Sequence, residues 1–446
     1  MGFAKTHFSP RARIACVSAR DSARAELCET FAGAGYECLG ESGDGRADLS
    51  LIDLRGHEIS AKRAQKLTAT LRRGSPESSM LFVAGPELSA VGRAHLRRAG
   101  EVVIVADTLI PAVDRCRDLL RLRNLAEETG ERLKSLAAAS RLTDFPPIET
   151  SNAAPSVLIA GTPGAQALMA IESAREVAGD CIGVLTAGQA MRAMETRGFD
   201  CAVFMPHGAG DPLLSLARAM RRHPKHRDLP VLFTADGEDG IAALSGRGAR
   251  EILLVEHMKE DLEARILAWT RRARLAAAMR RFLTASAGEG VRDKASGVFA
   301  GHFLQQHGAR ICARADQTHR PLSLLGVRLQ PEGGADMDRI SETRALRHAA
   351  ALVRRVTRAE DFLARLSRDV FIVAMPSTLD NDAERAGRRI EGVIANTMFR
   401  GRTDEELFPI RAQIAVYGRP RGACIEESVA GLLQAMSAQN PRVANI

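Results

Sequence analysis

Residues 1–290 carry one pattern of short apolar runs twice. The first four runs are 13–17, 48–53, 79–83 and 102–105, and the second four are 156–160, 200–204, 230–234 and 251–255. Leu51 and Val102 are 51 positions apart, as are Cys201 and Ile252. Because helix-length amphipathic stretches separate the runs, the pattern predicts two copies of a doubly wound α/β domain, each with a parallel sheet.

Two connecting regions divide the chain further. Residues 143–154 are rich in proline and polar side chains, which is typical of a linker. Residues 261–282 predict one long helix whose arginines, between 271 and 281, form a solvated face or else a ligand or partner surface. We therefore expect domains at 1–142, 155–282 and 283–446, with the linker at 143–154.

Length and composition fit a globular protein with several cores. A chain of 446 residues is too long for one core and suggests three domains. No apolar run approaches the length of a membrane span, and no signal-peptide core is found, so we expect a cytoplasmic protein. The eight cysteines, from Cys16 to Cys424, show no Cys-x-x-Cys pair or metal-ligand spacing and are interpreted as reduced structural thiols.

The formal net charge of +8 leaves several kinds of partner open. Aromatic residues make up only 4% of the chain, and no helix-turn-helix or base-stacking platform is found, which argues against nucleic acid. An anionic dinucleotide or an acidic protein partner would suit the charge equally well. A DNA-binding regulator is the weakest alternative, and steeply salt-dependent retention on DNA would support it.

The strongest candidate for a ligand site is Arg358-Ala-Glu-Asp361, which is followed five residues later by 367–371, Ser-Arg-Asp-Val-Phe. A guanidinium can donate two hydrogen bonds to guanine O6 and N7, and a carboxylate can accept from the N1–H and N2 donors of the same base. The spacing of three would put Arg358 and Asp361 on one side of a helical turn. The alternative is an ordinary surface ion pair.

These residues resemble the signature of diguanylate cyclase (GGDEF) domains, which make cyclic di-GMP from two GTP. In that family an Arg-x-x-Asp motif binds the product and lies five residues before a Gly-Gly-[Asp/Glu]-Glu-Phe turn. The resemblance lies within 283–446 and implies an α/β domain with a central, mostly antiparallel sheet. It also implies that Arg389, on the helix after the signature hairpin, completes the site for cyclic di-GMP. Arg385, one turn earlier, is a further candidate contact or part of a solvated basic face.

The catalytic turn departs from the family pattern. Ser367 and Arg368 replace the two glycines whose missing Cβ atoms give the triphosphate room. Val370 stands at the acidic fourth position, so only Asp369 keeps a carboxylate.

The strand before it departs as well. Its Asp-x-Asp motif, whose first Asp binds magnesium in the family, is replaced by Arg328 and Gln330. A cation at a magnesium position reverses the local electrostatics. We therefore predict that the domain is not an enzyme and holds no metal or cofactor; turnover of GTP would revive the cyclase alternative.

The two repeated domains resemble receiver domains of response regulators, which have a flavodoxin-like strand order. Receivers take phosphate on an Asp at the end of the third strand, where the first copy has Asp53. Its other family positions are altered: Asp21 is the nearest carboxylate after the first strand, Ala84 replaces Thr, and Ala106-Asp107 replaces Lys-Pro. Asp53 is thus a candidate phosphoacceptor or a vestige.

The second copy has lost more of the receiver pattern. Met205 stands at the acceptor position, although Thr234 survives after the fourth strand. Its expected role is packing, either in a homodimer or within the chain.

The order receiver, receiver, GGDEF-like domain resembles the PleD type of response regulator over nearly the whole chain. The resemblance to catalytically degenerate members implies a cyclic di-GMP effector or scaffold at a cell pole. Such an effector would control cell-cycle-regulated proteolysis through the adaptor RcdA and the ClpXP protease. The alternative is a phosphorelay receiver that acts through Asp53 and has a purely structural third domain.

Overall fold

The computed structural model describes residues 12–39, 47–57, 60–74, 79–106, 108–139, 148, 150–223, 225–245, 249, 251–286, 288, 290–331, 338–403 and 405–438. Asp107, half of the predicted linker (143–147 and 149), and residues 332–337 lie outside this part of the chain. The described residues form two compact units, one within Arg13–Leu122 and Glu149–Ala278, the other within Arg123–Ile148 and Met279–Ile446. The predicted boundaries of three domains stay a prediction.

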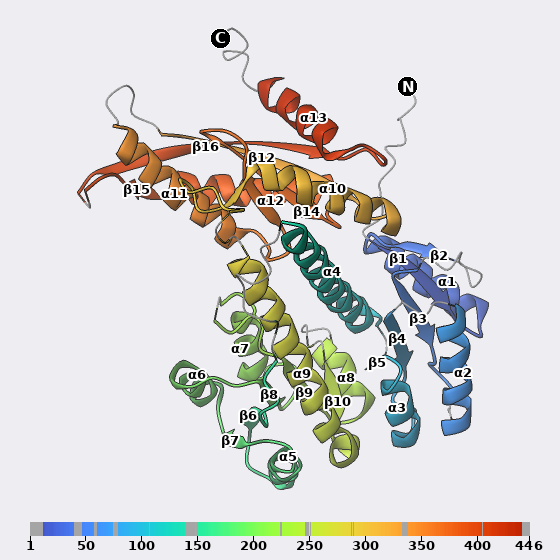
Figure 1. Cartoon of the computed structure of the whole chain (residues 1–446). Helices are drawn as coiled ribbons and strands as arrows, with labels where there is room; N and C mark the ends of the chain where they lie inside the picture. The colour runs from blue at the N-terminus through green and yellow to red at the C-terminus, as the bar shows by residue number, and fades with distance from the viewer. Residues whose placement is uncertain are drawn as a thin grey trace, which may run out of the picture. The chain divides into compact units, whose positions relative to one another are not determined.

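The first sheet contains five parallel strands in the order β2-β1-β3-β4-β5 (Figure 1, blue). The strands are β1 (Arg13–Val17), β2 (Glu37–Leu39), β3 (Leu49–Asp53), β4 (Ser79–Ala84) and β5 (Glu101–Ile104). The helices are α1 (Asp21–Gly33), α2 (Ala61–Gly74), α3 (Ala90–Arg97) and α4 (Ile110–Ala138).

The second sheet repeats this order as β7-β6-β8-β9-β10. Its strands are β6 (Ser156–Gly161), β7 (Asp180–Val184), β8 (Cys201–Met205), β9 (Val231–Ala235) and β10 (Ile252–Leu254). Its helices are α5 (Ala165–Arg175), α6 (Ala187–Thr196), α7 (Pro212–Met220), α8 (Gly237–Ser245), the short η2 (Val255–His257) and α9 (Met258–Ala285). The predicted pair of doubly wound parallel sheets with flavodoxin-like strand order is confirmed; their identity as receivers stays a prediction.

The two copies pack against each other within one compact unit. One apolar cluster joins Phe82 and Ile104 of the first copy to Phe204 and Ile252 of the second. The expected packing role of the second copy is therefore met by a contact inside the chain. Burial of apolar side chains from both sheets supplies the main favourable energy of this contact.

Buried ion pairs accompany this apolar cluster. Asp261 accepts hydrogen bonds from Arg93 (2.8 Å) and Arg97 (3.1 Å). Glu251 pairs with both Arg115 and Arg265, and all three side chains are buried. Each of these carboxylates, from the second copy, meets at least one guanidinium of the first copy, so the pairs join the two copies. Loss of a carboxylate would leave buried guanidiniums without a counter-charge.

Two arginines of α9 form ion pairs with other elements, whereas the sequence favoured a solvated face for them. Arg272 pairs with Glu101 and lies over the Trp269 ring, and Arg274 pairs with Asp200 (2.8 Å). That interpretation was wrong for these two residues, because carboxylates of other elements meet this side of the helix. Arg271 and Arg281 are exposed.

The third sheet is mixed and mostly antiparallel, in the order β11-β13-β14-β12-β16-β15, with only β11 and β13 parallel. Its strands are β11 (Phe299–Ala300), β12 (Leu322–Pro331), β13 (Phe362–Arg365), β14 (Val370–Pro376), β15 (Met398–Arg400) and β16 (Leu407–Gly418). Its helices are α10 (Gly301–Thr318), α11 (Arg339–Val356), α12 (Asp380–Ala395) and α13 (Ile425–Ala438). The predicted sheet type is confirmed. None of the helices in the described residues is long and apolar enough to cross a membrane.

Strand alternation places helices on both faces of this sheet. Leu325 and Val327 of β12 share an apolar cluster with α11 and α12, whereas Gly326 between them faces Met436 of α13. Successive side chains of a strand point to opposite faces, so β12 is covered on both. Helix α12 packs so close to the sheet that a Cβ on Gly387 would be 2.5 Å from a methyl carbon of Ile414. This close packing fixes the position of the arginines on the outer face of α12.

Candidate ligand-binding site

The Arg-x-x-Asp motif lies in a turn between α11 and β13 rather than within a helix. The Asp361 amide donates to the Arg358 carbonyl (3.2 Å), which closes the turn. The Arg358 amide in turn donates to Asp361 Oδ2 (2.8 Å). The carboxylate thus holds the backbone of its own motif, and the two residues stay adjacent although the predicted helical turn is absent.

Asp361 is a buried carboxyl with an unused acceptor. The residue is 8% exposed, and its Oδ1 has no hydrogen-bond partner among the described residues. Burial raises the pKa of Asp361 to about 7, the charge of Glu360 adds to this effect, and the Arg358 guanidinium opposes it. An unsatisfied buried acceptor costs free energy, which a ligand N–H could recover.

Two arginines converge on this turn. Arg358 is exposed, and its Nη1 lies 3.4 Å from Thr378 Oγ1 in the segment before α12. Arg389 is exposed on α12, and its Nη2 donates to the Val356 carbonyl (2.7 Å), at the end of α11. Neither guanidinium forms an ion pair within the part of the chain that the structure describes. The structure therefore places Arg389 beside the end of α11, two residues before Arg358.

Arg385 has different partners. Its Nη2 donates to Asp382 (2.7 Å) and its Nε to the Asn381 carbonyl (3.3 Å), both on its own helix. Its charge is already compensated by a carboxylate three residues away. It is thus the member of the predicted set that the structure does not join to the motif.

Residues 367–371, where the sequence departs from the family pattern, include the turn of the β13–β14 hairpin. The amides of Leu366 and Ser367 both donate to the Val370 carbonyl (2.9 and 3.3 Å). The side chain of Val370 belongs to the core, since the residue is only 4% exposed. On β12, Arg328 is directly opposite Val370 in the strand register.

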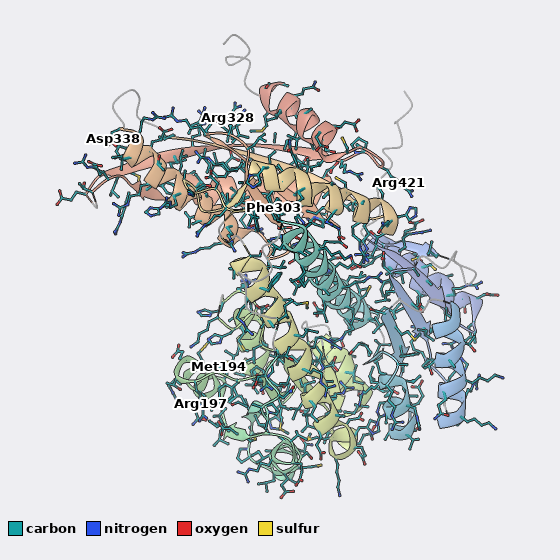
Figure 2. All side chains as sticks on the ribbon, in the orientation of Figure 1. Met194, Arg197, Phe303, Arg328, Asp338 and Arg421 are labelled. Atoms are coloured by element: carbon teal, nitrogen blue, oxygen red, sulfur yellow. The ribbon has the colours of Figure 1, made fainter. Side chains whose placement is uncertain are left out.

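Each guanidinium around this turn meets a carboxylate. Arg328, which Figure 2 labels, places its Nε 3.4 Å from Asp369 Oδ2. Arg368 pairs with Glu342 of α11, with Nε 2.9 Å from Oε1. A guanidinium therefore lies beside each of the two carboxylates, Asp369 and Glu342.

A third arginine holds the backbone of the same turn. Arg365 Nη1 lies 3.0 Å from Asp293 Oδ1, and Arg365 Nε donates to the Ser367 carbonyl (2.9 Å). One guanidinium thus ties the turn to the segment before β11.

Asp53 lies at the carboxyl end of β3 and is 5% exposed. Arg55 contacts both of its oxygens, through Nε to Oδ1 (2.9 Å) and Nη2 to Oδ2 (3.2 Å), and Ser18 Oγ donates to Oδ2 (3.3 Å). Asp21, the nearest carboxylate after β1, is paired with Arg24 (2.6 Å). A cation therefore already occupies the immediate surroundings of the candidate phosphoacceptor.

The second copy offers no carboxylate at the matching place. Met205 ends β8 and is buried, and Thr234 is buried on β9. Both side chains belong to the interior of the domain.

A buried charged cluster lies directly behind the motif and was not predicted. Glu128 Oε1 accepts from Arg132 Nε (3.0 Å) and contacts His307 Nε2 (2.8 Å), and all three residues are buried. The Arg132 guanidinium lies 4.9 Å from the ring centre of Phe362, the residue after Asp361. The spacing of four between Glu128 and Arg132 was visible in the sequence, but exposed helical ion pairs have the same spacing.

No protein-family model matches the chain, and no curated protein matches it. Among solved structures, the FimX GGDEF domain from Pseudomonas aeruginosa is 16% identical, with a TM-score of 0.32 over 34% of this chain and 95% of that one. The GGDEF domain of DgcB from Caulobacter crescentus, in complex with c-di-GMP, is 15% identical, with a TM-score of 0.31 over 35% and 90%. The diguanylate cyclase SiaD from Pseudomonas aeruginosa, in complex with its activator SiaC, is 15% identical, with a TM-score of 0.31 over 58% and 86%. The structure neighbours of the chain are thus GGDEF domains.

Proposed function

We propose that this chain binds cyclic di-GMP through Arg358, Asp361 and Arg389 and acts as an effector rather than as a cyclase. The observation that carries the proposal is the geometry at the end of α11. Within the described residues, the exposed guanidiniums of Arg358 and Arg389 form no ion pair, and the buried Asp361 carboxyl near them has no partner for its Oδ1. This arrangement leaves both positive charge and an acceptor for a ligand.

The chemistry of a guanine nucleotide suits these groups. The Arg358 guanidinium can donate in parallel to guanine O6 and N7, and Asp361 Oδ1 can accept from N1–H or N2–H. Arg389 would meet a phosphate or a second base, since a guanidinium pairs with phosphate in a bidentate way. The negative charge of the ligand would compensate the two arginines.

The same proposal assigns no catalysis to the β13–β14 turn. Phosphoryl transfer from GTP needs metal ions held by carboxylates beside the phosphates. Here Asp369 and Glu342 have arginine partners, and Val370 is buried in the core. A guanidinium beside a carboxylate competes with a metal ion for the same oxygens.

The cellular role of the proposed effector is inferred from the resemblance to a known protein. A receiver–receiver–GGDEF order with a lost catalytic turn resembles PopA, the degenerate paralogue of PleD. On that basis the effector would act at a cell pole with the adaptor RcdA and the ClpXP protease. The phosphorelay alternative is less favoured, because Arg55 engages both oxygens of Asp53.

Calorimetric titration of cyclic di-GMP into the full chain tests the proposal. Loss of a bidentate contact costs about 1–3 kcal/mol, so Arg358→Ala should weaken binding by roughly fivefold to 150-fold. Arg385→Ala is the matched control, since this arginine already pairs with Asp382, and binding should stay within about twofold.

Two results would contradict this proposal. Absence of binding to the unmodified chain would remove the receptor function. Turnover of GTP by the purified chain would restore the cyclase interpretation.

A further inference from the structure

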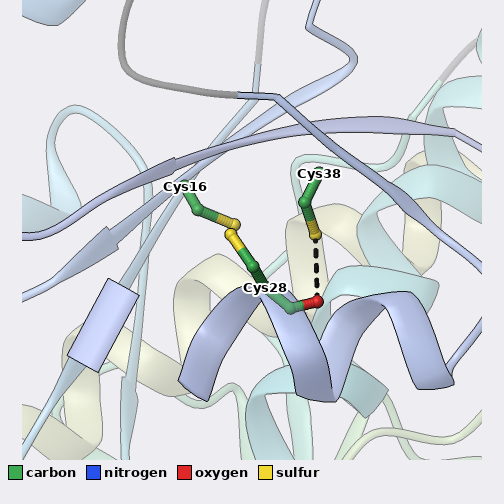
Figure 3. Close-up of side chains that lie close together, drawn as sticks. All are labelled: Cys16, Cys28 and Cys38. Atoms are coloured by element: carbon green, nitrogen blue, oxygen red, sulfur yellow. Dashed lines mark hydrogen bonds between the residues drawn. The ribbon is translucent and has the colours of Figure 1, made fainter. Parts of the chain in front are cut away.

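Three cysteines from three different elements meet in the first doubly wound domain. Cys16 lies on β1, Cys28 on α1 and Cys38 on β2, and their sulfur atoms all lie within 4.8 Å of one another (Figure 3). Cys16 is fully buried, whereas Cys28 and Cys38 are half-buried. Cys38 Sγ also donates to the Cys28 carbonyl (3.4 Å). Within the residues that the structure describes, this is the only such group of potential metal ligands.

The separation of the sulfurs suits a shared cation. Zinc–sulfur bonds are about 2.3 Å long, so sulfurs around one ion are about 3.8 Å apart in tetrahedral and about 4.0 Å apart in trigonal geometry. Thiols within 4.8 Å of one another reach these separations through side-chain shifts of less than about 1 Å. Two of the three residues are half-buried, so a cation can enter.

The second domain supplies an internal comparison for these positions. In the sheet register Ile14 is opposite Cys38, and Val157 is opposite Cys181. Cys16 is two residues after Ile14, just as Ile159 is two residues after Val157.

The three positions have the same separations along the chain in both domains. Cys16, Cys28 and Cys38 are separated by 12 and 10 positions, as are Ile159, Ile171 and Cys181. In the second domain the first two positions are therefore isoleucine, and Ile171 lies against β7, since its Cδ1 is 3.0 Å from a Cβ built on Gly183. Ordinary aliphatic side chains thus satisfy the packing of this fold, which does not itself require cysteines.

We propose that Cys16, Cys28 and Cys38 form a binding site for one thiophilic d10 cation, of which Zn²⁺ is the example. Three thiolates prefer such soft or borderline ions over Mg²⁺ or Ca²⁺, which take oxygen ligands. A disulfide would use only two of the sulfurs, whereas a cation uses all three and leaves a fourth position for water. The site would join β1, α1 and β2, and β1 leads two residues further to Ser18, which donates to Asp53.

Titration of the full chain with Cd²⁺ tests this site, because cadmium–thiolate bonds give an ultraviolet charge-transfer band. The chain is first reduced, freed of metal and kept without oxygen. We expect the band to saturate at one Cd²⁺ per chain and to be reversed by a large excess of Zn²⁺. Each of Cys16→Ala, Cys28→Ser and Cys38→Ser should abolish tight binding.

Cys181→Ser is the matched control, because it removes the corresponding thiol of the second domain and should leave the band unchanged. Far-ultraviolet circular dichroism establishes that each variant folds; Cys28→Ser and Cys38→Ser replace half-buried residues, so they test the site even if Cys16→Ala unfolds. Absence of the band, or a band that persists in the folded Cys28→Ser and Cys38→Ser variants, would overturn the proposal.

Discussion

The raised pKa of Asp361 makes the affinity for cyclic di-GMP depend on pH, if the proposed function holds. Burial and the charge of Glu360 raise this pKa to about 7, with a smaller contribution from Glu128 and an opposing one from Arg358. Only the ionised carboxylate can accept from guanine N1–H and N2–H without a competing proton. Ligand binding should therefore strengthen as pH rises through about 7.

The size of the effect follows from the ionised fraction. With a pKa of about 7, the carboxyl is about one-tenth ionised at pH 6 and about nine-tenths ionised at pH 8. The dissociation constant should thus fall about tenfold between these values, which corresponds to about 1.4 kcal/mol. Isothermal titration in buffers of different ionisation enthalpy measures both the affinity and the protons released on binding.

Two variants separate Asp361 from other titrating groups. Glu360→Gln removes the like charge beside the carboxyl, so the midpoint of the pH profile should move to lower pH and binding at pH 6 should improve. Glu391→Gln, an exposed carboxyl on α12, should leave the profile unchanged. An unmodified chain that binds cyclic di-GMP with equal affinity from pH 6 to 8 would refute the reasoning, as would a Glu360→Gln profile with the original midpoint.

Two further predictions concern stability. Glu251→Gln leaves two buried arginines without a counter-charge and should lower the free energy of unfolding by about 3–5 kcal/mol. Denaturant titration followed by the fluorescence of Trp269, the single tryptophan, measures this change. A loss below about 1 kcal/mol would contradict the buried pairing. Gly387→Ala puts a Cβ 2.5 Å from a side chain of β16, so it should lower the free energy of unfolding by about 1–3 kcal/mol and weaken cyclic di-GMP binding. The control Gly392→Ala, on the same helix, has open space around the new Cβ and should be neutral or stabilising. Equal effects of the two changes would contradict the close packing of α12.

Regular spacing made the two parallel sheets predictable from the sequence. The central strands β3 and β8 are fully buried along their length and are mostly apolar, and the intervals that follow them repeat at 51 positions. The mostly antiparallel third sheet followed from the family resemblance of the motif around Arg358. The ligand-site residues themselves stay a prediction, although the structure brings Arg389 to the motif.

What the sequence could not predict depends on contacts between distant positions. Cys16, Cys28 and Cys38 are 12 and 10 positions apart, which matches no metal-binding spacing, and only the meeting of β1, α1 and β2 brings them together. The same holds for Asp261, whose partner Arg93 is 168 positions away. Single-sequence periodicity identifies the buried face of an element, but not which element it faces.

The excess of basic residues is a poor guide to partners for the same reason. A net charge of +8 suggested an anionic partner, yet many arginines are committed inside the chain. Arg115 and Arg265 share Glu251, and Arg328 meets Asp369. An arginine that is paired inside the chain is less available to an external anion, because breaking the pair would weaken the compensation of a buried charge.

The arginines that can meet an anion at little cost are therefore exposed ones that lack a carboxylate partner. Arg385 fails this criterion because of Asp382, whereas Arg358 and Arg389 satisfy it within the part of the chain that the structure describes, and the nearby Asp361 has an unused buried oxygen there. The electrostatic case for an anionic ligand thus rests on the local pairing of these two residues and not on the total charge of the chain.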